Sequence, residues 1–118
     1  MKLPNASQAF VDIDKLSEYC LSPYHKRGKH KAHLFFSVLG LTENDAYRLR
    51  KTLLEAVLNY DAEEGCEDMY GKRYTVDFIM ATAKGKATVR SAWIIRTHEK
   101  FARLTSCYIL KQGRESYE

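Results

Sequence analysis

The sequence predicts an α+β domain in which N-terminal helices pack on one face of a C-terminal antiparallel sheet of three or more strands. Two observations predict this class. Apolar residues recur at helical spacing up to about residue 60, and after Gly71 they alternate with polar residues in the period of a strand. The chain has 118 residues, of which 45% are hydrophobic and 29% charged, which is enough for one core. We expect a single domain over residues 1–110.

Two helices are expected before residue 40. Asp12 can cap the first, from Ile13 to about Leu21, and Pro23 ends it because proline disfavours helical geometry in the residue before it. The second is expected from Lys29 to Leu39, with Gly40 as its C-terminal stop.

A third helix is expected to begin after Thr42, a suitable capping residue, and to end near Tyr60. The acidic stretch Asp61–Asp68 follows it, and we interpret this stretch as a solvated loop between helix and sheet. A competing interpretation stays open, in which the loop folds back over Lys29 and Lys31 as an internal lid.

Alternation of period two predicts three strands, over Tyr74–Met80, Ala87–Arg96 and about Arg103–Leu110. The stretch Ala83–Lys86 contains a glycine and is expected to form the turn between the first two. Residues 111–118 are polar and are expected to form a frayed tail.

Several classes of protein are excluded by what the sequence lacks. No apolar run approaches the roughly 20 residues that span a bilayer, and Met1–Asn5 lacks the apolar region of a signal peptide, so we expect a soluble, cytoplasmic protein with no membrane partner. Cys20, Cys66 and Cys107 are widely spaced and odd in number, which favours free thiols in a reducing compartment. Glycine-rich nucleotide motifs and HExxH are absent, and we expect neither a cofactor nor a metal.

Positive charge is concentrated between residues 25 and 33, a stretch called the basic segment from here on. The chain carries a formal net charge of +4. The segment holds four cations interleaved with three histidines: Lys26, Arg27, Lys29 and Lys31, with His25, His30 and His33. A concentrated positive field attracts polyanions such as RNA, although such charges are also typical of a solvated helix end.

The basic segment has the parts that RNA cleavage without a metal needs. Lys29 is the expected first residue of the second helix, and a helix N-terminus offers free N–H groups to a phosphate. His30 can exchange a proton near neutral pH. In such a reaction a base takes the proton of the ribose 2′-OH, cations stabilise the charged transition state, and an acid protonates the leaving 5′ oxygen.

Arg90, Ser91 and Trp93 lie on the second expected strand, where Ser91 and Trp93 share one face. Taken alone, the tryptophan and the serine are best interpreted as core residues. In a functional interpretation, Ser91 bonds a phosphate oxygen and Trp93 stacks on a base. Arg90, Arg96 and Arg103 would then line a nucleic-acid face, or they are ordinary exposed strand charges.

The pattern Arg27-x-Lys29-His30, followed by Ser91-x-Trp93, resembles the catalytic pattern of the colicin D nuclease domain. It departs from that family at Arg27, where the family has lysine. The resemblance implies cleavage of tRNA without a metal, and inhibition by an acidic immunity protein. The order of helices and sheet also resembles the wider group of barnase, EndoU, colicin and RelE-like ribonucleases.

A second resemblance covers nearly the whole chain. Three stretches are similar to a family of uncharacterised bacterial domains, found as free-standing proteins and at the C-termini of polymorphic toxins: Leu3-Pro4-Asn5, Gly28–Ala32 and Val89–Trp93. This resemblance implies no established activity.

The leading hypothesis is a metal-independent endoribonuclease toxin that acts on tRNA, with an acidic antitoxin or immunity protein as partner. His30 would transfer the proton beside Lys29, within a phosphate's reach of Ser91, and Trp93 would build the site. The residues expected to hold phosphate are Arg27, Lys31, Arg90 and Lys26. The alternative is a binding module without catalysis, in which the same segment docks a nucleic acid or an acidic protein. An enzyme that uses one of the cysteines ranks last.

Overall fold

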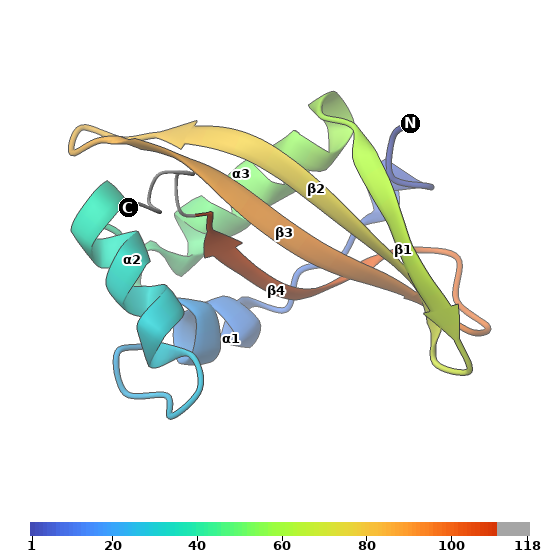
Figure 1. The fold of residues 1–118 in the computed structure, drawn as a ribbon, viewed down its shortest axis with the longest axis horizontal. Helices are drawn as coiled ribbons and strands as arrows, with labels where there is room; N and C mark the ends of the chain where they lie inside the picture. Colours follow the sequence, from blue (N-terminus) through green and yellow to red (C-terminus); the bar gives the residue numbers. More distant parts are fainter. Residues whose placement is uncertain (111–118) are drawn as a thin grey trace, which may run out of the picture.

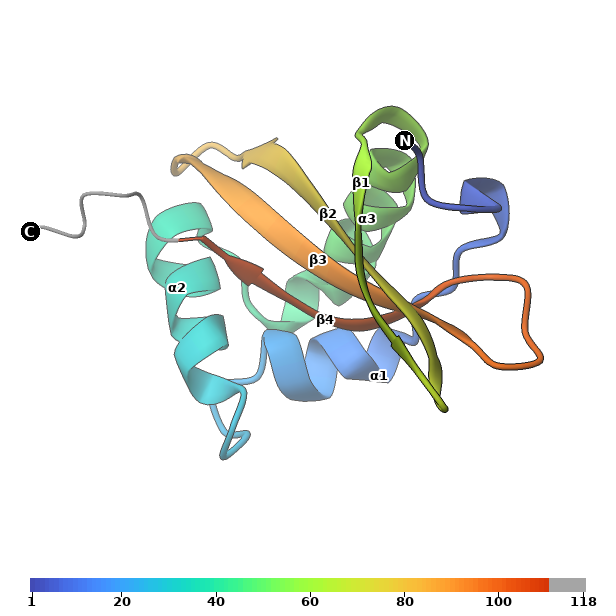
Figure 2. The ribbon, with the colours of Figure 1, turned by 45° about the vertical axis from the view of Figure 1, so that its right-hand side comes forward.

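The computed structural model of the chain describes residues 1–110 and confirms the α+β class, with the helices N-terminal to a four-stranded antiparallel sheet (Figure 1). The helices gather on one face of the sheet and leave the other face uncovered by any helix of the described residues (Figures 1 and 2). The expected polar tail, residues 111–118, lies outside the described residues.

The sheet is a meander, in which each strand pairs with the next along the chain in the order β1-β2-β3-β4. The strands are β1 (Ala62–Asp68), β2 (Gly71–Ala81), β3 (Lys86–Arg96) and β4 (Arg103–Ile109). In this register Tyr74 pairs with Trp93, and Ser91 pairs with Cys107. The three expected strands are therefore present, with one further strand before them.

The helical half contains three α-helices and three short turns. These elements are η1 (Ala6–Gln8), α1 (Ile13–Lys15), η2 (Leu16–Cys20), α2 (Lys29–Leu39), η3 (Glu43–Asp45) and α3 (Ala46–Asn59). The Asp12 carboxylate caps α1 by accepting from the Asp14 N–H at 3.0 Å, and the chain continues as the π-helical turn η2. Helix α2 begins and ends at the expected residues, and Gly40 ends it with a φ of 72°.

Thr42 caps the third helix as expected. Its N–H donates to Asp45 Oδ2 at 2.8 Å, and its hydroxyl accepts from the Asn44 N–H at 3.2 Å. This reciprocal arrangement satisfies N–H groups that have no partner inside a helix. It fixes the turn η3 at the start of α3, which ends at Asn59.

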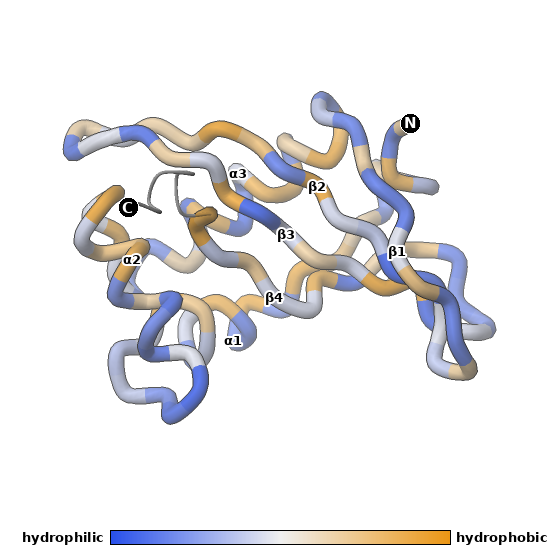
Figure 3. Tube along the Cα trace, viewed as in Figure 1, coloured by the Kyte–Doolittle hydropathy of each residue, from blue (hydrophilic) through white to orange (hydrophobic). Residues whose placement is uncertain are grey.

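The acidic stretch Asp61–Asp68 is strand β1 over most of its length, so the expectation of a loop is wrong. Ala62 pairs with Val76 and Glu67 with Lys72 on β2, with an irregular register between them. Strand β1 forms the edge of the sheet opposite to β4, whereas α2 packs against β4 and β3. Figure 3 shows the two hydrophilic stretches, β1 and the loop before α2, at opposite ends of the molecule. The acidic stretch therefore does not cover Lys29 or Lys31.

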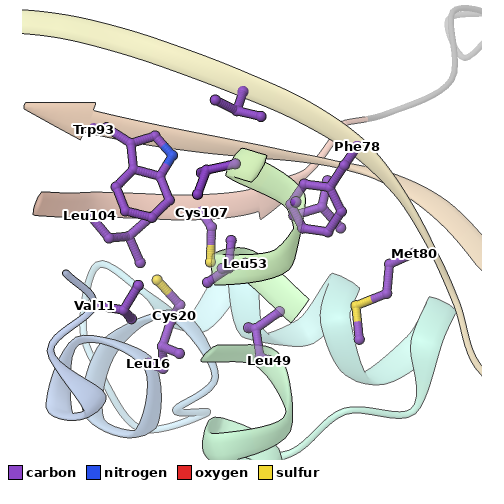
Figure 4. Close-up of a cluster of buried hydrophobic side chains, with 14 of the residues drawn as sticks. Val11, Leu16, Cys20, Leu49, Leu53, Phe78, Met80, Trp93, Leu104 and Cys107 are labelled. Atoms are coloured by element: carbon purple, nitrogen blue, oxygen red, sulfur yellow. The ribbon is translucent and has the colours of Figure 1, made fainter. Parts of the chain in front are cut away.

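The core lies between the helices and the inner face of the sheet (Figure 4). Strands β2 and β3 contribute alternate residues, and α2 contributes Ala32, Phe35 and Leu39. Phe36, which the helical spacing of apolar residues also placed in the buried stripe of α2, is instead 54% exposed. Its largest fully buried side chains include Trp93, Phe35, Leu16, Leu49 and Leu53. None of the helices within residues 1–110 is long and apolar enough to cross a membrane.

Candidate functional site

His25 organises the loop that leads into α2. Its Nδ1 atom accepts from the backbone N–H groups of Arg27 and Gly28, both at 3.0 Å, and its carbonyl accepts from the Lys29 N–H at 2.9 Å. The N–H groups of Arg27, Gly28 and Lys29 are therefore bonded within the loop and are not free for a phosphate.

Gly28 lets this loop approach η2 closely. A Cβ atom at Gly28 would stand 2.2 Å from the carbonyl oxygen of Tyr19, so any larger residue forces the loop away. The Tyr19 ring also meets the His25 ring edge-on, with 4.7 Å between the centroids. The position of the basic side chains thus depends on Tyr19, His25 and Gly28. Sequence reasoning did not assign this role to any of the three.

Lys31 ties α2 to its neighbours and is half-buried. Its Nζ atom donates to the Tyr19 hydroxyl at 2.7 Å and lies 5.6 Å from the Tyr108 ring centroid on β4. One of the three N–H donors of the Lys31 ammonium is therefore used within the fold, and the expected phosphate contact from Lys31 stays a prediction. Lys26, Arg27 and Lys29 are exposed and form no ion pair within residues 1–110.

A groove of about 520 Å³ runs beside α2. Lys29, His30 and His33 line it from the first turns of the helix, and Phe36 lines it one turn further on. Glu43 of η3 contributes a carboxylate from another wall. Two imidazoles, an ammonium group and a carboxylate therefore share one concave surface. His30 and His33 also border a second depression of about 400 Å³ on the side of Tyr108.

Ser91 and Trp93 are fully buried in the core, so the expectation that they contact RNA is wrong. The Trp93 indole donates from Nε1 to Ser91 Oγ at 2.8 Å, and the Ser91 hydroxyl donates to the Val76 carbonyl at 2.7 Å. Figure 4 shows the indole pointing into the core above Leu104. The Ser91 hydroxyl is bonded to the Trp93 indole and to the strand backbone. Ser91 is buried and His30 is exposed, so the two residues do not line a common surface.

Arg90 is paired with a carboxylate of the neighbouring strand. On the face of the sheet that none of the helices within residues 1–110 covers, its guanidinium donates two hydrogen bonds of 2.8 Å to the Asp77 carboxylate. These bonds raise the pKa of Arg90 above its usual value and neutralise its charge locally. Arg73 and Arg103 are likewise paired, with Asp68 and Glu99. Because Asp77 neutralises the charge of Arg90, the structure does not support the expected phosphate contact from Arg90.

The cysteines give no support to a thiol enzyme. Cys20 and Cys107 are buried side by side in the core (Figure 4), and the hydrogen bond between them lowers the pKa of Cys20 to about 7. The same bond and burial raise the pKa of Cys107. Neither thiol reaches a substrate. Cys66 is exposed on the acidic strand β1, and no three ligating side chains within residues 1–110 gather into a metal site.

Comparison with known proteins gives a family but no relative of known function. A family model described as a domain of unknown function, DUF6883, matches residues 2–111. No curated protein and no solved structure matches the chain significantly.

Proposed function

The chain belongs to the DUF6883 family, and from its groove we propose that it is a metal-independent endoribonuclease. One observation carries this proposal: Lys29, His30 and His33 line a single groove. Lys29 forms no ion pair with a carboxylate within residues 1–110, in contrast to Arg73, Arg90 and Arg103 on the sheet. The site proposed here is therefore on α2 alone and leaves out Ser91 and Trp93.

The two imidazoles are the proposed acid and base. His30 and His33 are three residues apart on α2, which brings their Cβ atoms to about 5–6 Å and lets both rings reach one phosphate. One ring takes the proton of the ribose 2′-OH as the O2′–P bond forms. The other gives a proton to O5′ as the P–O5′ bond breaks, which leaves a 2′,3′-cyclic phosphate and a free 5′-OH. Lys29 stabilises the extra negative charge of the transition state.

Incubation of the purified protein with RNA in excess EDTA tests the proposal. We expect cleavage products that end in 2′,3′-cyclic phosphates, and we expect His33→Gln to lower the rate about 100-fold or more. His98→Asn is the matched control, because His98 is an exposed histidine of the β3–β4 loop and asparagine tolerates its φ of 79°. Intact RNA with the wild-type protein, or equal rates for wild type and His33→Gln, would overturn it.

Binding without catalysis is the second candidate. It is favoured by Lys26, Arg27 and Lys29, which form no ion pair within residues 1–110. These side chains would bind a polyanion whether or not the histidines transfer protons. In this case His30→Gln binds RNA like the wild type, Lys29→Ala binds it weakly, and neither protein yields cleavage products. An acidic protein that competes with RNA would identify the same surface as a docking site.

A ribonuclease whose site lies open on the surface must be restrained in its own cell, and we propose a cytoplasmic toxin with an acidic inhibitor. An acidic protein that covers Lys26, Arg27 and Lys29 would replace the RNA backbone and associate quickly. Induced expression in bacteria should stop growth for the wild type, and a His30→Gln/His33→Gln double variant should be tolerated. Unaffected growth with the wild type, at confirmed expression and without a partner, would contradict the toxin proposal. A tRNA substrate remains a proposal from the resemblance to colicin D.

A further inference from the structure

The groove beside α2 differs in character from one end to the other. Lys29 lies in the first turn of α2 and Phe36 two turns later, which at 1.5 Å per residue separates them by about 10 Å along the helix axis. The chain leaves α2 at the Phe36 end, where the Leu41 N–H donates back to the Phe35 carbonyl at 3.0 Å. Glu43 follows two residues later. Lys29 therefore marks one end of the groove and the Phe36 ring the other, while Glu43 lines the groove from η3, which packs against η2.

The Phe36 end of the groove provides an apolar surface for a flat group. Phe36 is 54% exposed although it is a large hydrophobic side chain, and Pro23 and Leu21 line the groove with it. The Lys84 ammonium lies 5.0 Å from the centroid of the Phe36 ring and also donates to the Phe36 carbonyl at 3.3 Å, which holds the ring in place. Nucleobases stack on such exposed aromatic rings.

Glu43 supplies a carboxylate acceptor to the groove from a backbone position that the Thr42 cap holds. Its backbone is held by the Thr42 cap, while its half-buried side chain makes no hydrogen bond or ion pair within the part of the chain that the structure describes. An ionised carboxylate has two acceptor oxygens and no donor. It is therefore matched by a ligand that presents two neighbouring N–H donors.

We propose that this groove binds a guanine base of the RNA, that Phe36 offers the stacking surface and that Glu43 selects the base, an inference that rests on the proposed ribonuclease function. Guanine presents N1–H and the N2 amino group side by side on its Watson–Crick edge, so both carboxylate oxygens of Glu43 can accept. Adenine and cytosine place an acceptor nitrogen beside their amino group, and uracil has one N–H between two carbonyls. The volume of about 520 Å³ falls in the range of small-ligand sites, about 300–1,000 Å³. The phosphate then lies toward Lys29.

Titration with the four nucleoside 5′-monophosphates, followed by NMR of the backbone amides, tests the inference. GMP is expected to bind about tenfold or more tightly than AMP, CMP and UMP, the discrimination that a bidentate pair provides. Glu43→Gln should remove this preference, while Glu55→Gln on the exposed face of α3 should keep it. Lys29→Ala should weaken all four nucleotides alike, because it acts on the phosphate.

Inosine 5′-monophosphate provides a test that needs no variant. It keeps N1–H and lacks the N2 amino group, so we expect it to bind more weakly than GMP. Equal affinities of the wild type for GMP, inosine monophosphate and AMP would overturn guanine selection. RNA cleavage in EDTA at positions unrelated to guanine would overturn it as well and leave the ribonuclease proposal standing. If RNA is neither bound nor cleaved, both proposals fail.

Discussion

Trp93, the single tryptophan of the chain, is held by one serine. A buried indole N–H needs an acceptor, and Ser91 Oγ provides it while donating its own hydrogen to the Val76 carbonyl. The pair therefore joins β3 to β2 from within the core, because Ser91 faces Val76 across the two strands. The Ser91–Trp93 pair therefore stabilises the fold and takes no part in a surface site.

Ser91→Ala should destabilise the protein without changing its chemistry. The substitution leaves the Trp93 N–H and the Val76 carbonyl with one partner fewer each, and we expect the free energy of unfolding to fall by about 1–3 kcal/mol. Urea denaturation followed by tryptophan fluorescence measures this loss. Ser37→Ala, on the exposed face of α2, is the control and should cost little. An unchanged urea midpoint for Ser91→Ala would contradict the account of the pair.

Strand β1 and helix α2 show what could be predicted from the sequence at the scale of elements. The cap and stop signals around α2 are local, so both of its ends could be predicted. Only Ala62 of β1 is buried, and six exposed residues follow it, so no apolar alternation marks the strand. Its pairing with β2 comes from the hairpin and from contacts such as Asp68 with Arg73, which composition does not reveal.

The candidate site, too, could be predicted from the sequence only in part. The positive charge of the basic segment could be predicted because it depends on residue types alone. The groove could not, because Glu43 comes ten residues after His33 in the sequence, and only the turn after α2 brings it to the same surface. The burial of Ser91 and Trp93 follows from which face of β3 the helices cover. That was the interpretation favoured by the residues alone, and the resemblance to colicin D pointed the other way.

The β1–β2 hairpin should lose stability in acid. Hydrogen bonds from Arg73 and from the Tyr70 N–H lower the pKa of Asp68 below its ordinary value of 3.8. A carboxyl group with a lowered pKa in the folded state stabilises the fold above its ordinary pKa, and this contribution is lost as the pH falls through the folded value. The difference in urea midpoint between wild type and Asp68→Asn should therefore shrink below pH 3.8. A difference that stays constant down to pH 2 would count against the pair, and Glu63→Gln serves as the unpaired control.

At the scale of the whole molecule, the basic segment and strand β1 lie apart. The basic segment leads into α2, and β1 is the edge of the sheet opposite to β4 (Figures 1 and 3). Two carboxylates of β1 are paired with cations of β2, whereas Lys26, Arg27 and Lys29 form no ion pair within residues 1–110. An approaching polyanion is therefore attracted toward the basic segment, which favours association in one orientation.

The salt dependence of RNA binding should report how many phosphates the protein contacts. Each phosphate contacted on a single strand contributes a slope of roughly −0.7 to the plot of log affinity against log salt concentration. Contacts from Lys26, Arg27 and Lys29 therefore predict a slope of about −2, which Lys29→Ala should reduce by about 0.7. Lys51→Ala on α3 provides a control outside the groove. A slope near zero for the wild type would remove the basic segment from the binding surface.

The central claim is that RNA is cleaved in the groove beside α2 and not at the Ser91–Trp93 pair. The most direct measurement compares initial rates of RNA cleavage in EDTA for His30→Gln and Ser91→Ala, both below their unfolding temperatures. We expect His30→Gln to lose about 100-fold or more with unchanged stability, because the exposed ring acts only on substrate. Ser91→Ala should cleave RNA at the wild-type rate although it is less stable. A folded Ser91→Ala protein that has lost activity, or a fully active His30→Gln protein, would contradict the claim.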